Sequence, residues 1–145
     1  MLTYFFKKIT LFKKIIKYTK SLEINEIKKL LCQNIIFQKK TCLFFSCDSL
    51  LVMASVRGSI ELVLLFLEHG YPVDEICSMG DTTLYIACVF EDIEMIELLL
   101  AYKANPNKFT KYGSSCLFKA TEKGNEKIIK LLLSKEAVMS KNELE

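Results

Sequence analysis

A repeat with a period of 33 residues constrains the fold of this chain more than any other feature of its sequence. The stretch GDTTLYIACVFEDIEMIELLL, residues 80–100, returns as GSSCLFKATEKGNEKIIKLLL at residues 113–133. A third copy, CDSLLVMASVRGSIELVLLFLEHG, precedes both at residues 47–70. The copies keep their phase at three sets of equivalent positions: Leu51, Leu84 and Leu117; Ala54, Ala87 and Ala120; Leu65, Leu98 and Leu131. Three copies in phase predict a repeat protein, in which like units stack on one another.

Each copy predicts two short helices followed by a turn-rich stretch. In the middle copy we expect the first helix at residues 84–90 and the second at residues 93–101. The first helix carries a small residue, Ala87, where two helices must approach closely. One apolar stripe with helical spacing runs along the second helix and consists of Ile93, Ile96, Leu99 and Leu100. The pattern therefore predicts an all-α fold.

A left-handed backbone conformation is expected at the junction between the two helices of each copy. Gly58 and Gly124 occupy this junction in the first and third copies, and glycine tolerates that conformation. Glu91 takes their place in the middle copy, where we expect the same turn to cost about 1 kcal/mol. Pro72 and Pro106 follow the second helices and prevent them from continuing.

This pattern resembles the ankyrin repeat, whose signature is G-x-T-P-L-H-x-A-A, then G-H-x-E-[IV]-V, then L-L-L and a glycine. The middle copy matches at Gly80, Thr82, Leu84, Ala87, Cys88, Glu94, Ile96, Leu98, Leu99 and Leu100. The third copy matches at Gly113, Leu117, Ala120, Gly124, Leu131, Leu132 and Leu133. Thr83 and Tyr85 replace the usual proline and histidine, and the first copy has Cys47 for the opening glycine. Because the T-P-L-H element caps the first helix, we expect its erosion to lower stability without changing the fold.

The resemblance covers roughly residues 44–138 and implies an ankyrin-type solenoid of stacked helix–turn–helix repeats with β-turn or hairpin-like tips. We expect one domain, divided into an N-terminal helical cap or degenerate repeat at 1–43, ankyrin repeats at 44–76, 77–109 and 110–138, and a C-terminal tail at 139–145. Lys127, Lys130 and Ser134 are expected on the outer face of the last helix, as in a repeat that closes a stack.

The N-terminal segment leaves several interpretations open. Residues 1–22 hold six lysines and no acidic residue. A helix over residues 3–20 could pair with the apolar stripe in SLEINEIKKLL and cap the stack. The same helix could instead lie on an anionic membrane surface. Nucleic-acid binding is not favoured, because these lysines are not accompanied by arginine and the rest of the chain is mildly acidic.

Residues that could carry chemistry are few. The chain has six cysteines without a C-x-x-C pair and one histidine, so we expect neither a metal site nor a cofactor. Cys88 and Cys116 fall at small or apolar positions, as buried free thiols do, and reduced thiols fit a cytoplasmic protein. His69 ends a second helix, where it is expected to interact with the helix C-terminus. No phosphate-binding loop or catalytic constellation is recognisable, and we therefore expect no enzyme.

The resemblance implies that a partner protein binds the concave face, which consists of the tips and the exposed side of the first helices. The family's variable positions correspond here to Phe45, Asp48, Val56, Arg57, Met79, Asp81, Val89, Phe90, Lys111, Tyr112, Ser114, Glu122 and Lys123. Six of them are apolar or aromatic, more than a solvated face normally carries. Some are expected to pack against neighbouring repeats, Phe45 first among them.

The expected function is that of a non-enzymatic scaffold for protein–protein interaction, with a partner that the sequence does not name. One alternative is a peripheral membrane adaptor tethered by residues 1–20. The other is a fragment of a larger ankyrin-containing effector or adaptor, since a fold alone does not define a substrate or partner.

Overall fold

The computed structural model describes residues 17, 23–32, 49–140 and 143. The chain divides into two compact units, Met1–Phe45 and Ser46–Glu145. In the first unit the structure describes helix α2 (Ile24–Cys32), on which Ile27 is fully buried. The segment SLEINEIKKLL is thus helical from Ile24 onwards, as its apolar stripe predicted. The other predicted helix, residues 3–20, lies outside the described residues except for Lys17.

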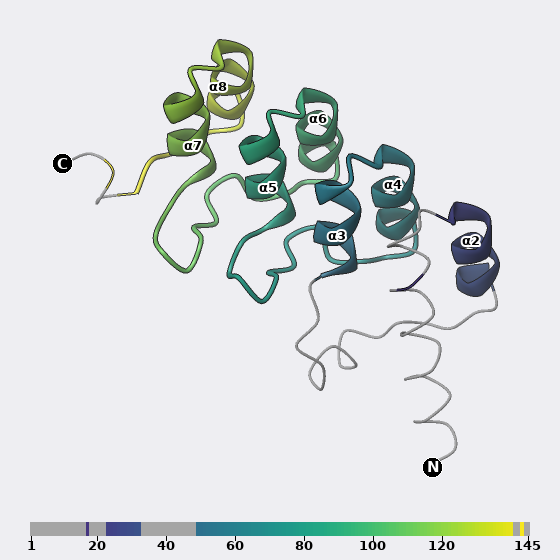
Figure 1. The fold of residues 1–145 in the computed structure, drawn as a ribbon. Helices are drawn as coiled ribbons and strands as arrows, with labels where there is room; N and C mark the ends of the chain where they lie inside the picture. Colours follow the sequence, from purple (N-terminus) through teal and green to yellow (C-terminus); the bar gives the residue numbers. More distant parts are fainter. Residues whose placement is uncertain (1–16, 18–22, 33–48, 141–142, 144–145) are drawn as a thin grey trace. The chain divides into compact units, whose positions relative to one another are not determined.

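The second unit consists of three helical hairpins that follow one another along the chain. They are α3 (Leu50–Val56) with α4 (Ile60–Glu68), α5 (Thr83–Phe90) with α6 (Ile93–Ala101), and α7 (Cys116–Lys123) with α8 (Glu126–Leu133). The first helices α3, α5 and α7 pack side by side in one layer, and the second helices α4, α6 and α8 form another (Figure 1). The prediction of an all-α stack is confirmed, and in the middle copy the expected helix bounds are met to within one residue.

The first helix of each hairpin begins at a hydroxyl side chain that recurs with the repeat. Ser49, Thr82 and Ser115 accept hydrogen bonds from backbone N–H groups three residues later, at 3.5, 3.2 and 3.0 Å. The same role at the second helices falls to Ser59, Asp92 and Asn125. Such caps satisfy donors that the first turn leaves without partners, and each contributes about 1 kcal/mol. The capping residue is therefore kept in all three repeats although the proline and histidine of the signature are not.

The junctions between paired helices have the backbone conformation that the sequence predicts. Gly58, Glu91 and Gly124 are left-handed, with φ of 64°, 58° and 72°. The N–H of Asp92 then donates to the carbonyl of Ala87 at 3.1 Å and closes the turn. Glu91 thus adopts a conformation that disfavours side chains, because its two neighbours in the stack require the same turn.

The ends of the second helices contain a second set of left-handed residues, which the sequence analysis missed. Lys103 and Glu136 have φ of 63° and 58°, at positions equivalent to Gly70. The following residues, Ala104 and Ala137, donate their N–H groups back to the helix, at 2.9 and 3.1 Å. These bonds satisfy carbonyl groups near the end of each second helix. They also fix the direction in which the following loop leaves the helix.

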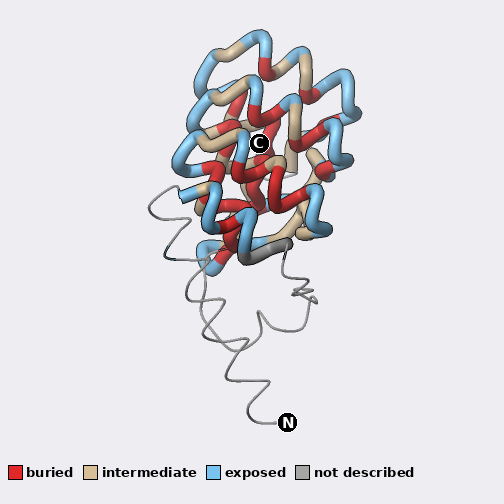
Figure 2. Tube along the Cα trace, turned by 90° about the vertical axis from the view of Figure 1, so that its right-hand side faces the viewer, coloured by how far each residue is buried: buried red, intermediate tan, exposed pale blue. Residues whose placement is uncertain are grey.

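The core lies between the two layers and between successive hairpins, along the middle of the stack in Figure 2. Ala54, Ala87 and Ala120 are at most 1% exposed, which allows the first helices to approach closely. The predicted stripe on α6 needs one correction: Ile93 is only half-buried, whereas Met95 is fully buried. A second helix packs on its own first helix as well as on its neighbours in the layer, so its buried face is wider than one stripe.

The loops between consecutive repeats are fastened by a side-chain acceptor that recurs with the period. Oδ1 of Asp74 accepts the N–H of Asn105 at 2.9 Å. Oδ1 of Asn107, at the equivalent position one repeat later, accepts the N–H of Val138 at 2.8 Å. Nζ of Lys108 adds a 2.9 Å bond to the carbonyl of Asp74. Each loop is thus held against the next, and the loops in turn carry the tips.

Candidate functional site: the tips and the first helices

Each described tip is a tight hairpin, as predicted. The closing backbone bonds run from the N–H of Cys77 to the carbonyl of Asp81, at 3.0 Å, and from the N–H of Thr110 to the carbonyl of Ser114, at 2.9 Å. The N–H of Lys111 also donates to the carbonyl of Gly80 at 3.2 Å. We call the tip at residues 77–81 the second tip and the tip at residues 110–114 the third tip, after their repeats. The two are joined directly, so the side chains on them keep a fixed spacing.

Gly80 marks the closest approach between these two tips. Its φ is 85°, and a Cβ added there would lie 2.6 Å from Cβ of Lys111. Glycine is required twice over, by the backbone conformation and by the space that the Lys111 stem occupies. Nζ of Lys111 in turn lies 4.9 Å from the centroid of the Tyr112 ring, within the range of a cation–π interaction.

Both tips expose a pair of large apolar side chains. Met79 and Tyr112 are equivalent positions and are 63% and 79% exposed. Ile76 and Phe109 form a second equivalent pair and are 52% and 40% exposed. The candidate set included the first pair and missed the second, although its apolar character recurs with the same period. Repeated exposed apolar residues are typical of a binding surface, since solvated hairpins favour polar ones.

The polar candidates on the tips are less open to solvent. Asp81 and Ser114 are half-buried, whereas Lys111 is exposed. Partial burial raises the pKa of Asp81, while the positive charge of Lys111 acts in the opposite direction. Asp81 and Lys111 therefore form one local electrostatic unit beside the exposed Tyr112 ring.

The first helices contribute candidates near their C-terminal ends. Val56 and Phe90 are 49% and 58% exposed, and Arg57 and Lys123 are also exposed. Val89 is half-buried. The candidates Phe45 and Asp48 lie outside the described residues.

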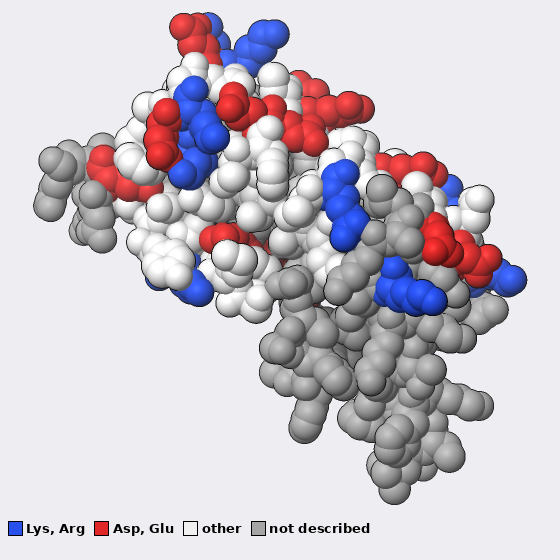
Figure 3. All heavy atoms as spheres, viewed as in Figure 1, with Lys and Arg blue, Asp and Glu red and all other residues white. Residues whose placement is uncertain are grey.

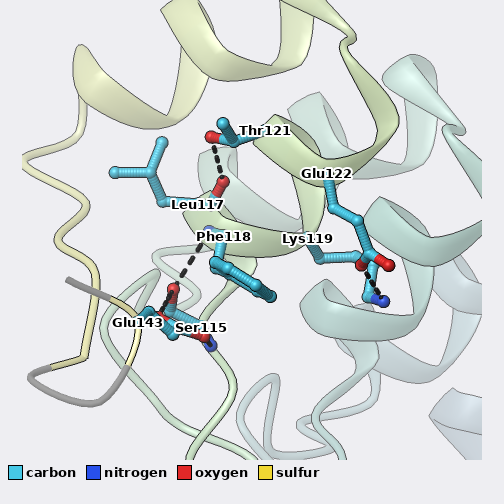
Figure 4. A network of polar contacts seen from close by, with 7 residues as sticks. All are labelled: Ser115, Leu117, Phe118, Lys119, Thr121, Glu122 and Glu143. Carbon is cyan, nitrogen blue, oxygen red and sulfur yellow. Dashed lines mark hydrogen bonds and ion pairs between the residues drawn. The ribbon is translucent and has the colours of Figure 1, made fainter. Parts of the chain in front are cut away.

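Glu122, the remaining candidate on α7, forms an ion pair with Lys119 (Figure 4). The hydrogen bond between the two side chains raises the pKa of Lys119 and lowers that of Glu122. The Glu122 side chain is half exposed, so solvent screens the pair and its contribution to stability is small. Its main effect is to occupy the carboxylate of Glu122.

The buried thiols do not form a reactive site. Cys88 and Cys116 are fully buried on α5 and α7, as the sequence predicted. A hydrogen bond with the Cys88 thiol, together with burial, raises the pKa of Cys116 well above its ordinary value. Thiols are nucleophilic as thiolates, so this environment makes Cys116 inert at neutral pH. The equivalent positions one repeat earlier hold Ser55 and Thr83, whose buried hydroxyls lack hydrogen-bond partners.

The single histidine lies at the end of a helix. Nδ1 of His69 lies 2.8 Å from the carbonyl of Leu65, so the ring contacts the end of α4, as predicted. Within the described residues, no three His, Cys, Asp or Glu side chains converge as metal ligands. No helix in the described part of the chain is long and apolar enough to cross a membrane.

A polar contact that the sequence did not reveal supports the start of α7 (Figure 4). Both the hydroxyl and the N–H of Ser115 donate to the carboxylate of Glu143, at 2.7 and 2.8 Å. The N–H of Ser140 donates to the same carboxylate at 2.8 Å. The segment after α8 is thereby attached to the last repeat, close to the third tip.

A model of the family described as ankyrin repeats (3 copies) matches residues 50–143. With the stacked hairpins, the recurring caps and the hairpin tips, this match shows that the chain belongs to the ankyrin-repeat family. Ankyrin repeats are generally protein–protein interaction modules and are typically not enzymes. No curated protein matches the chain.

Proposed function

We propose that this chain is a non-enzymatic interaction module that binds a partner protein through its concave face, meaning the tips and the exposed side of α3, α5 and α7. The observation that carries the proposal is the recurrence of exposed apolar residues on the tips, continued by Phe90 on α5. Aromatic side chains at interface centres supply most of the binding energy in many complexes.

The free thiols Cys77, Cys88 and Cys116 support a cytoplasmic location. We further propose that the repeats divide at residues 44–76, 77–109 and 110–138.

The experiment is affinity capture from cytosolic extract, with this purified chain as the bait. It compares the wild type with a Phe90→Asp, Tyr112→Asp double variant. Both side chains are exposed, so the variant is expected to keep its helical circular dichroism while losing the partner. A matched control is Tyr102→Asp with Leu133→Asp. These exposed apolar residues lie on the second helices: Tyr102 at the end of α6 and Leu133 at the end of α8. Capture that survives in the first variant, or is lost equally in both, contradicts the concave-face assignment.

The membrane-adaptor alternative depends on residues 1–20, nearly all of which lie outside the described part of the chain. Its support is the run of lysines without acidic residues. Deleting residues 1–20 distinguishes it: loss of binding to anionic liposomes with an unchanged melting temperature indicates an anchor, and a lowered melting temperature indicates a cap.

A further inference from the structure

Two thiols from consecutive repeats contact each other inside the stack. Cys88 lies on α5 and Cys116 is the first residue of α7, and both side chains are fully buried. A hydrogen bond joins the two thiols. It spans the joint at which α5 packs on α7, so the pair links the second repeat to the third. Two thiols in contact can also be oxidised to a disulfide, which a single thiol cannot form alone.

The preceding joint shows that this position does not need sulfur for packing. Ser55 on α3 and Thr83 on α5 occupy the equivalent positions one repeat earlier. Both residues are buried, yet neither hydroxyl has a hydrogen-bond partner. A small polar pair therefore fills the same place without a bond across the joint. Of the two joints between the described hairpins, the later one alone carries a thiol on each side.

We propose that Cys88 and Cys116 form a reversible disulfide that locks α5 to α7 when the protein meets a peroxide. This inference does not depend on the partner binding proposed above. Disulfides inside cells are usually transient and respond to oxidants. The bond would fix the spacing between two helices that carry part of the proposed binding face.

The chemistry needs one molecule of hydrogen peroxide for each disulfide. One thiol loses its proton, and the thiolate attacks a peroxide oxygen and breaks the O–O bond, which gives a sulfenic acid and hydroxide. The sulfur of the other thiol then attacks the sulfenic sulfur, the S–O bond breaks and water leaves. The two thiols together lose two electrons and two protons, and the peroxide is reduced to two molecules of water.

The closed stack protects the pair from this reaction. Neither side chain is exposed, and in Figure 3 the side chains over this part of the molecule form a closed surface. The raised pKa of Cys116 also disfavours its thiolate. Peroxide therefore reaches the thiols when α7 separates from α5, and repeat stacks open locally at such joints. Closure of the joint returns the two sulfur atoms to contact, where the disulfide forms.

The test oxidises the full chain with about 1 mM hydrogen peroxide and maps its disulfides by mass spectrometry. Trypsin with chymotrypsin separates Cys77 from Cys88, because Tyr85 lies between them. We expect a peptide pair that links Cys88 to Cys116 and that dithiothreitol cleaves. The melting temperature should rise by roughly 10 °C on oxidation, because the bond closes a long loop of the unfolded chain. Reduction should reverse the rise.

The double variant Cys88→Ser with Cys116→Thr copies the pair that already packs at the preceding joint. It should therefore fold, and its melting temperature should not rise with peroxide. The matched control is Cys77→Ser, which removes another buried free thiol, at the second tip. This control should keep both the link and the rise.

Three results would overturn the inference. In the first, Cys88 stays reduced or is joined to a different cysteine. In the second, the link forms without a rise in melting temperature, so the bond does not fit the closed stack. In the third, the double variant shows the same rise, so other thiols cause it. The peptide map uses the wild-type chain, so it decides the question even if the double variant fails to fold.

Discussion

The hydroxyl of Ser115 donates a 2.7 Å hydrogen bond to Oε2 of Glu143, which lies 28 residues further along the chain. The oxygen of the same hydroxyl accepts the N–H of Phe118 at 3.0 Å and so caps α7. Glu143 thus fixes the position of the Ser115 side chain that caps α7. Burial alone would raise the pKa of Glu143, but the hydrogen bonds from Ser115 and Ser140 outweigh it and lower the pKa.

Stability should therefore fall in mild acid through Glu143. A carboxyl whose pKa is lowered by folding stabilises the protein above the unfolded pKa, about 4.3 for Glu, and this stabilisation is lost as the pH falls through the folded pKa. Replacing Glu143 with Gln should lower the free energy of unfolding at neutral pH by about 1 kcal/mol or less, because solvent screens the site. Melting temperatures of both proteins between about pH 7 and pH 3 measure the effect.

The two melting curves should converge at the acidic end of that range. Glu122→Gln is the control, since its exposed ion pair contributes little and should leave the pH profile nearly unchanged. Parallel curves for wild type and Glu143→Gln would show that the Ser115 contact does not stabilise the fold.

Thr83→Pro should stabilise the chain by about 1 kcal/mol. Thr83 is the first residue of α5, where proline fits, and its buried hydroxyl has no hydrogen-bond partner. The preceding residue, Thr82, has φ of −87° and ψ of 160°, a conformation that a following proline tolerates. Urea denaturation monitored by circular dichroism measures the change.

Thr83→Val separates the two contributions to this gain. Valine removes the unsatisfied hydroxyl without restricting the backbone, so its stability should lie between those of the wild type and Thr83→Pro. A proline variant less stable than the wild type would mean that the start of α5 cannot hold the ring.

Gly80→Ala should destabilise the stack more than Gly70→Ala does. The two glycines have similar φ, 85° and 79°, so the conformational cost of adding Cβ is about 1–2 kcal/mol at each. Only at Gly80 does the new Cβ collide with Lys111, which should add about 1–3 kcal/mol; at Gly70 the space is open. Equal losses in denaturant unfolding would show that the second and third tips do not press together in solution.

Period and spacing predicted the backbone of this protein well because the repeat imposes one conformation three times. Glu91 shows this clearly: its left-handed turn was predicted from the glycines at equivalent positions, against its own preference. The burial of Cys88 and Cys116 followed from the same reasoning. The left-handed conformations of Lys103 and Glu136 were not predicted, because neither residue is a glycine and their side chains give no local signal for that conformation.

The candidate surface was harder to predict, because exposure depends on how repeats pack rather than on their period. Ile76 and Phe109 were not among the predicted surface residues, yet both are exposed on the tips. Val89 and Phe90 are neighbours on one helix, yet Phe90 is exposed and Val89 is half-buried. The contact between Ser115 and Glu143 has no counterpart in local sequence, since it depends on the course of the chain after α8.

The acceptors Asp74 and Asn107 make the length of this stack adjustable. The middle repeat supplies a backbone N–H, that of Asn105, to the acceptor of the previous repeat. It also supplies an acceptor, Asn107, to the backbone N–H of the next repeat. A duplicated block of residues 77–109 would present the same donor to Asp74 and the same acceptor to Val138. Modules of 33 residues could thus be inserted, exchanged or removed while the joints between them stay the same.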